Sequence, residues 1–185
     1  MLRINSISDL DNLPKEMSNL MVGWNINQKL ENLPNNIHTL RLGFGFNQKL
    51  ENLPNSLHTL QLGFSFNQKL ENLPNSLHTL QLSDMFNQKL ENLPTNLHIL
   101  RFGWQFNQKL ENLPDNLHTL QLGEHFNQKL EELPPNLCII NIFNKNLNID
   151  SLHDKYILEV IDNGSNKTIN IKGRKGMFTK SSNKL

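Results

Sequence analysis

Cysteine is scarce in this sequence of 185 residues, and long apolar runs and an excess of either charge are absent. The single cysteine, Cys138, excludes a disulfide framework within the chain. No stretch approaches the roughly 20 apolar residues that a membrane helix needs, and no apolar run follows Arg3 at the start of the sequence. We therefore expect a reducing location, cytoplasmic or otherwise intracellular, without secretion and without membrane contact.

Sequence motifs of catalysis are missing as well. The net charge is +1, so no strong overall field draws the chain to nucleic acid or to a membrane surface. Neither a P-loop nor a GxGxxG sequence occurs, and no Ser/His/Asp arrangement singles out a nucleophile. We predict that the protein is not an enzyme and that it needs no cofactor.

The sequence contains instead a repeat of 20 residues. The phrase FNQKLENLPNSLHTLQL fills residues 46–62 and returns unchanged at 66–82. Leu-Pro pairs recur with the same step, at Leu13-Pro14, Leu33-Pro34, Leu53-Pro54, Leu73-Pro74, Leu93-Pro94, Leu113-Pro114 and Leu133-Pro134. Such a period is typical of a solenoid, in which each unit buries its apolar face against the next unit.

The apolar positions within one unit favour a short strand over a helix. They lack the i, i+3, i+4, i+7 spacing of a helix, and every unit contains a proline. Leu60-Gln61-Leu62 alternates instead, as a half-buried strand does. We predict a repeat solenoid, mainly β, over residues 1–149, with about seven units of which the first and last are degenerate. We expect the units to form a parallel sheet with extended or 3-10 returns.

One unit, LPNSLHTLQLGFSFNQKLEN, resembles the FNIP repeat, a relative of the leucine-rich repeat. The spacing L-x-x-L-x-L is kept in LHTLQL, whereas only Phe-Asn of the Phe-Asn-Ile-Pro tetrad remains, as in Phe46-Asn47. The likeness covers about residues 10–143. It implies a role in protein interaction, and proteins with this repeat are known from social amoebae and giant viruses. Residues 13–23 fit the repeat columns, so the F-box found in some relatives is not expected here.

The repeat template ends near residue 149, and we predict a C-terminal region of residues 150–185. Residues 156–161 and 167–171 read as two strands joined by a turn-rich linker, which favours a β-hairpin that caps the solenoid. Six basic residues and no acidic residue follow in the tail: Lys167, Lys172, Arg174, Lys175, Lys180 and Lys184. This basic tail either contacts phosphates or is a soluble terminus.

Stacked units turn every repeated position into a ladder of like side chains about 4.8 Å apart. We predict a structural ladder of buried asparagine amides, which donate to and accept from the backbone. Its members are Asn27, Asn47, Asn67, Asn87, Asn107 and Asn127. The lysine and glutamate columns that include Lys49 and Glu51 are expected to be exposed and to offset each other.

A second ladder consists of histidines, at His38, His58, His78, His98 and His118. Such a ladder could bind a metal or sense pH, or it could fill the bend before each strand. Metal ligands must converge on one point, which a one-dimensional ladder does poorly. We therefore expect a structural role and no metal site.

Positions that vary inside the strict template are free to meet a partner. They lie on the outward strand face and just beyond the glycine, and they include aromatic residues and arginines, which dominate interface energetics. We predict partner binding by Trp24, Arg41, Phe44, Gln61, Phe64, Gln81, Asp84, Arg101, Trp104, Gln121 and Glu124. The alternative is that these aromatic residues pack locally along the edge of the loop.

The favoured hypothesis is a monomeric, non-catalytic scaffold or adaptor that binds an unknown protein partner on the strand face. One alternative is a nucleic-acid-associated protein that binds through its basic C-terminal tail. Another is a metal-dependent enzyme that uses the histidine column. We expect the scaffold or adaptor that binds a protein, with no nucleic acid, membrane or metal bound.

Overall fold

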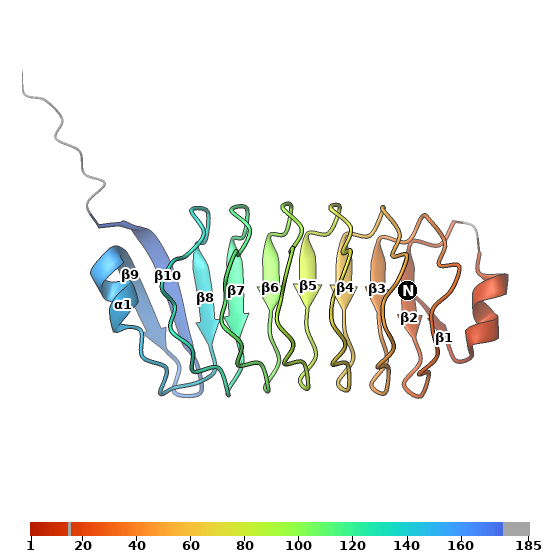
Figure 1. Cartoon of the computed structure of the whole chain (residues 1–185), viewed down its shortest axis with the longest axis horizontal. Helices are drawn as coiled ribbons and strands as arrows, with labels where there is room; N and C mark the ends of the chain where they lie inside the picture. The colour runs from red at the N-terminus through yellow and green to blue at the C-terminus, as the bar shows by residue number, and fades with distance from the viewer. Residues whose placement is uncertain (15, 176–185) are drawn as a thin grey trace, which may run out of the picture.

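A computed structural model of the chain describes residues 1–14 and 16–175. Its strands are β1 (Leu2–Ile4), β2 (Asn19–Val22), β3 (Thr39–Arg41), β4 (Thr59–Gln61), β5 (Thr79–Gln81), β6 (Ile99–Arg101), β7 (Thr119–Leu122), β8 (Ile139–Ile142), β9 (Tyr156–Asp162) and β10 (Lys167–Arg174). A 3-10 helix, η1 (Ile7–Asn12), and an α-helix, α1 (Asp150–Lys155), lie near the two ends of the array. All the strands join one ten-stranded sheet in the order β1-β2-β3-β4-β5-β6-β7-β8-β10-β9 (Figure 1).

The strands from β1 to β8 run parallel. From β2 to β8 neighbouring strands pair residues that are 20 positions apart, whereas β1 pairs with β2 at an offset of 18 residues. Leu60 of β4 pairs with Leu40 of β3 on one side and with Leu80 of β5 on the other. Each repeated side chain therefore stacks on its own copy one coil away. The predicted parallel solenoid with a 20-residue period is confirmed.

A typical coil is closed by two tight turns and one left-handed residue. In one coil the amide of Leu57 donates to the Pro54 carbonyl at 3.0 Å, and after the strand the amide of Phe66 donates to the Gly63 carbonyl at 3.2 Å. The return that follows is extended with bends, so the extended alternative holds in the described coils. It reverses at an asparagine with positive φ, a conformation that Asn tolerates better than most residues. These asparagines are Asn32, Asn52, Asn72, Asn92 and Asn112, with φ between 53° and 57°.

The core is a spine of leucine and phenylalanine columns. Leu60 and Phe66 are fully buried, and their copies in the adjacent coils are buried as well. The rings of the Phe66 column stack at centroid distances of 6.2–6.4 Å. At Gly63 the neighbouring backbone comes so close that a Cβ would lie 1.8 Å from the Gly43 carbonyl oxygen. Glycine at position 63 therefore allows this close approach at the strand end. Position 83 of the same column is a buried serine, whose hydroxyl donates to the Phe66 carbonyl.

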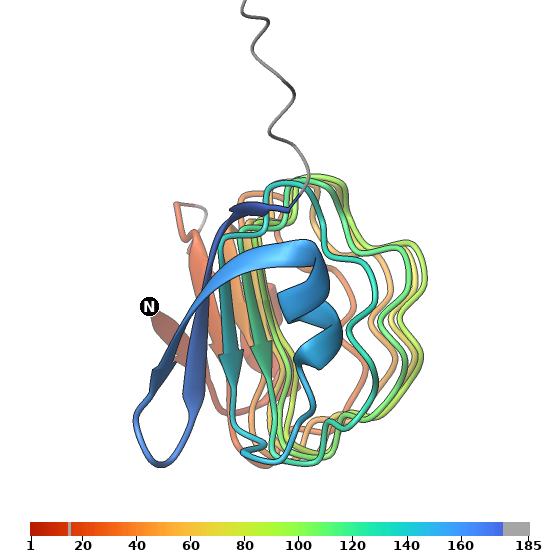
Figure 2. The ribbon, with the colours of Figure 1, turned by 90° about the vertical axis from the view of Figure 1, so that its left-hand side faces the viewer.

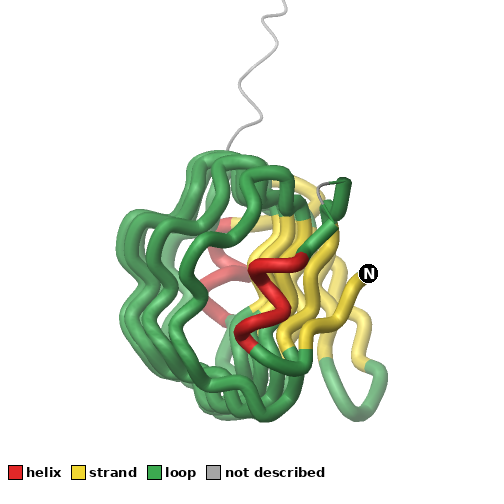
Figure 3. Tube along the Cα trace, turned by 90° about the vertical axis from the view of Figure 1, so that its right-hand side faces the viewer, coloured by secondary structure: helices red, strands yellow, loops and turns green. Residues whose placement is uncertain are grey.

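The N-terminal end is covered by β1 and η1, which the sequence patterns do not predict. β1 pairs in parallel with β2, and η1 lies across the mouth of the coil (Figure 3). A capping box starts η1, because the Ser6 side chain accepts from the Ser8 amide and the Asp9 carboxylate accepts from the Ser6 amide. Leu10 of η1 is buried and closes the leucine column.

The C-terminal end is covered by the predicted hairpin together with α1. β10 pairs antiparallel with both β8 and β9, so the hairpin continues the sheet. β9 ends one residue and β10 three residues beyond the predicted strand ends. α1 was not predicted; it turns the buried Leu152 toward the core and lies across the open coil (Figure 2). The division of the chain at residue 149 stays a prediction.

Candidate functional site

The outward strand face is a polar surface that is half exposed. Gln61 and Gln81 are half-buried and bind each other, with the Gln61 amide donating to Gln81 Oε1 at 3.0 Å. Arg41 is exposed, and Arg101 is half-buried. The two glutamines therefore satisfy part of their hydrogen-bonding capacity within the protein, whereas Arg41 is open to solvent.

A second line of side chains, here called the aromatic rim, runs beside the strand face at the carboxyl ends of the strands. Its members are Trp24, Phe44, Phe64, Asp84, Trp104 and Glu124. Trp24, Phe44 and Trp104 are 61%, 53% and 56% exposed. Phe64 is half-buried and stacks on Phe44, with centroids 4.7 Å apart and planes inclined by 1°. Local packing thus accounts for this one pair of rings.

Backbone hydrogen bonds keep the aromatic rim in register. The Met85 amide donates to the Phe64 carbonyl at 3.2 Å, and the Gln105 amide donates to the Asp84 carbonyl at 2.9 Å. The same bond joins His125 to Trp104 at 3.1 Å. The rim is therefore an ordered continuation of the sheet ladder. The structure brings the predicted partner-binding residues into two neighbouring lines, and their binding of a partner stays a prediction.

The asparagine ladder links each coil to the next. The backbone N–H of Asn47 donates to the side-chain oxygen Oδ1 of Asn27 at 2.8 Å. The same bond recurs through the column up to Asn127, whose backbone N–H donates to Asn107 Oδ1 at 3.0 Å. These side chains are exposed or half-exposed, not buried as expected. The reason is that the turn after the strand lies at the surface, so each amide caps the neighbouring backbone while one side stays open to water.

The histidine ladder is a stack of nearly parallel rings. Consecutive centroids from His38 to His118 lie 5.1–5.2 Å apart. Each Nδ1 lies near the carbonyl two residues earlier, as His58 does with the Ser56 oxygen at 2.6 Å. Because a carbonyl only accepts, Nδ1 is the donor. Parallel rings do not converge, and residues 1–14 and 16–175 hold no group of three or more His, Cys, Asp or Glu placed for a metal.

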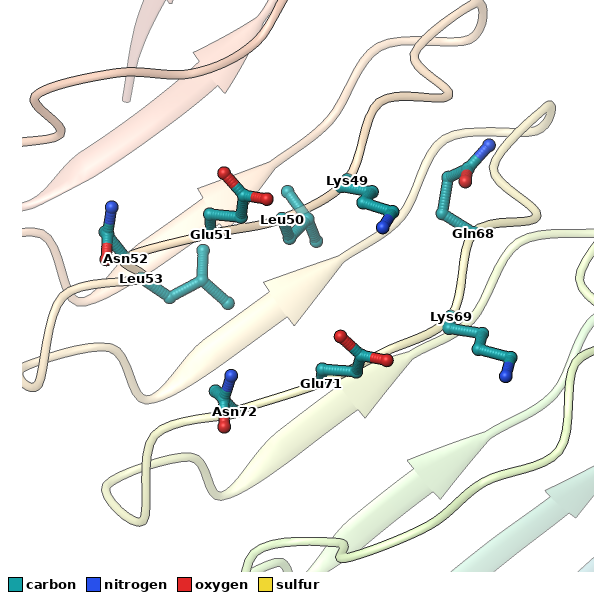
Figure 4. Close-up of a pocket in the computed structure, with 9 residues that line it drawn as sticks. All are labelled: Lys49, Leu50, Glu51, Asn52, Leu53, Gln68, Lys69, Glu71 and Asn72. Atoms are coloured by element: carbon teal, nitrogen blue, oxygen red, sulfur yellow. The ribbon is translucent and has the colours of Figure 1, made fainter.

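The return side carries shallow grooves between successive coils. Figure 4 shows one of them, with the Lys49 and Glu71 side chains turned toward each other across it. Similar grooves recur one coil forward and one coil back. The ion pair found in the described part of the chain joins Lys172 to Glu159 at 3.0 Å, away from these columns. A groove that repeats with the coil reflects coil geometry and does not single out a binding site.

Four of the six basic tail residues lie in the described part and hold the cap. Lys167 donates to the Lys145 carbonyl at 2.8 Å, and Lys172 pairs with Glu159. Arg174 donates to the Leu133 carbonyl at 3.0 Å, and Lys175 donates to the His153 carbonyl. The remaining two, Lys180 and Lys184, lie outside the described residues.

Among residues 1–14 and 16–175, the structure contains no helix with the length and apolar character of a membrane span.

Comparisons with known proteins agree with this geometry. The family model of the FNIP Repeat matches residues 46–85 and 86–125. The chain is also similar to the crystal structure of CroV588, described as a novel circular LRR protein, at 43% identity and a TM-score of 0.65. That likeness covers 70% of this chain and 21% of CroV588, so the chain spans about a fifth of that protein's length. No curated protein matches the chain. Residues 46–125 are therefore FNIP repeats, and the chain folds as a leucine-rich-repeat-like solenoid.

Proposed function

We propose that this protein is a non-catalytic interaction scaffold that binds another protein on its strand face and aromatic rim. One observation carries the proposal. Trp24, Phe44 and Trp104 are each more than half exposed, although the coil closes its core without them. Large aromatic side chains held on an ordered surface are the residues that contribute most to protein–protein affinity.

The arrangement of the surface supports the same conclusion. Repeat solenoids present extended, rigid faces to their partners. Here the strand face supplies polar groups such as Arg41, and the aromatic rim beside it supplies apolar area. The return side carries the polar grooves that recur between coils. A partner that lies along the strands therefore meets both kinds of contact at once.

Site-specific photo-crosslinking tests the proposal. A benzophenone amino acid is placed at Arg101 or Gln121 on the strand face, and at Glu111 on the return side as the matched control. We expect the same protein to be crosslinked from both strand-face positions and not from Glu111. The double variant Trp24→Ala, Trp104→Ala is expected to lose this product while its circular dichroism spectrum stays unchanged. Equal crosslinking from Glu111, or a product that survives the double variant, would overturn the proposal.

A further inference from the structure

Acidic residues alternate with aromatic residues along the second half of the aromatic rim. Its order there is Phe64, Asp84, Trp104 and Glu124, one residue for each coil. Asp84 is half-buried, and its carboxylate has no hydrogen bond or ion pair to another residue in the described ranges. An unpaired negative charge thus lies between two large aromatic side chains.

The ladder fixes the distances in this part of the rim. Because backbone hydrogen bonds join the rim residues of successive coils, each step along the rim is one strand spacing, about 4.8 Å. Phe64 and Trp104 are two steps apart, which is roughly 10 Å. One face of the Phe64 ring is covered by the parallel ring of Phe44. The other face is turned toward the level of Asp84.

These dimensions suit a cation. A positive group bound beside the Asp84 carboxylate would be one strand spacing, about 5 Å along the rim, from the level of Phe64 and from the level of Trp104. Both spacings are inside the limit of about 6 Å for a cation–π interaction. The Asp84 carboxylate at the same level would supply the counter-charge. A guanidinium group fits better than an ammonium, because it is planar, stacks on aromatic faces and binds a carboxylate through two N–H donors.

We propose that Phe64, Asp84 and Trp104 form a recognition slot for an arginine side chain of a basic peptide segment. The proposal rests on the proposed function and names the chemistry of the partner. Residues 1–149, the predicted solenoid, carry 11 basic and 13 acidic residues, a net charge of −2, and two of these acidic residues, Asp84 and Glu124, lie on the aromatic rim itself.

A second contact follows from the same spacing. Glu124 is exposed and lies on the far side of Trp104, two coils from Asp84 and therefore also about 10 Å from it. A polyproline II peptide rises about 9.3 Å over three residues and returns each third side chain to the same face. The slot and Glu124 together therefore select two arginines three residues apart.

Fluorescence anisotropy with the full chain tests the slot. The probe is a labelled Arg-Pro-Pro-Arg-Pro-Pro-Arg peptide, and citrulline in place of arginine gives a neutral peptide of the same shape. We expect the arginine peptide to bind and the citrulline peptide to bind at least tenfold more weakly, on the order of one cation–π contact with its ion pair. Equal binding of the two peptides would overturn the proposal.

Two matched variants separate the slot from general electrostatics. Asp84→Asn is expected to weaken binding about tenfold, as is Trp104→Ala. Asp115→Asn removes the same charge from an exposed turn at the opposite end of a strand and should leave binding unchanged. Equal losses in Asp84→Asn and Asp115→Asn would mean diffuse attraction and would reject the slot.

Tryptophan fluorescence reports on the slot directly. In a Trp24→Phe variant Trp104 is the remaining tryptophan, since the chain has two, and the arginine peptide should change its emission. An unchanged emission during measured binding would contradict the slot. If strand-face crosslinking succeeds while the arginine peptide fails to bind, the proposed function stands and only this inference falls.

Discussion

The hydroxyl of Tyr156, at the start of β9, accepts a hydrogen bond of 3.1 Å from the backbone amide of Leu133 in the last coil. Both residues are buried. Tyr156→Phe keeps the ring but leaves the Leu133 amide unpaired, which we expect to cost about 1–3 kcal/mol of unfolding free energy. Urea unfolding followed by circular dichroism measures the loss. Ile161→Val, on the exposed part of the same strand, should stay within about 0.5 kcal/mol of the parent; an equal loss in both variants would contradict this explanation.

We expect replacement of glycine by alanine to lower the unfolding free energy at one position and to leave it nearly unchanged at another. Gly63→Ala places a methyl group against the Gly43 carbonyl, 1.8 Å away before any adjustment, so the coils must separate. We expect a loss of about 1–3 kcal/mol, as for other overpacked sites. Gly173→Ala meets only the end of the Ile157 side chain at 3.8 Å and should change the unfolding free energy little. Similar denaturation midpoints for the two variants would show that the glycine column does not depend on close backbone approach.

The left-handed asparagines make a prediction about backbone conformation. Asn72 has a φ of 54°, where an ordinary residue is strained and glycine is not. We expect Asn72→Ala to be less stable than Asn72→Gly by about 1 kcal/mol, measured by thermal unfolding. Asn75→Ala, in the exposed turn that follows, is the control and should have little effect. Alanine as stable as glycine at position 72 would rule out the conformational explanation.

The capping box at η1 predicts a dependence on pH. Hydrogen bonds from the Asn5 and Ser6 amides to the Asp9 carboxylate hold the pKa of that carboxyl below its usual value. Because the folded pKa is the lower one, the carboxylate stabilises the fold above the ordinary aspartate pKa of about 4. This contribution is lost as the pH falls through the lowered pKa.

NMR titration of the Asp9 carboxyl checks the direction of the shift. The Asp9→Asn variant should lose part of the decrease in stability that the parent shows between neutral pH and a pH of about 2. Asp115→Asn, which removes a carboxylate from an exposed turn, is the matched control. An Asp9 carboxyl that titrates at or above the ordinary aspartate pKa would refute the prediction.

The repeated part of the fold could be predicted because the same spacing of apolar residues recurs in successive coils. Leu60 and Phe66 keep their columns over many units, and the parallel sheet follows from that spacing. The helices at the two ends could not be predicted in the same way, because η1 and α1 each occur once and the period carries no information about them. The C-terminal hairpin was predicted from its own strand and turn pattern. The Ser6 to Asp9 spacing in SISD is a capping signal that, in retrospect, marks the start of η1.

The candidate site was predicted as a set of positions and not as a geometry. Variation inside the template identifies Phe64, Asp84 and Trp104 as free positions. The repeat also predicts that these positions line up, one in each coil. That the line is held by backbone hydrogen bonds beyond the ends of the strands is seen only in the structure. The expected burial of the asparagine ladder was wrong for a related reason, since spacing alone does not tell which side of a turn faces water.

The two ends of the array pair with the coils beside them, β1 with β2 and β10 with β8. Residues 46–62 and 66–82 are identical, so a coil removed between them brings together surfaces that already match. Recombination between these near-copies in the gene would shorten or lengthen the rod by whole coils without any change to its closures. The length of the strand face, which we propose as the binding surface, can therefore be inherited in whole-coil steps, independently of the architecture of its ends.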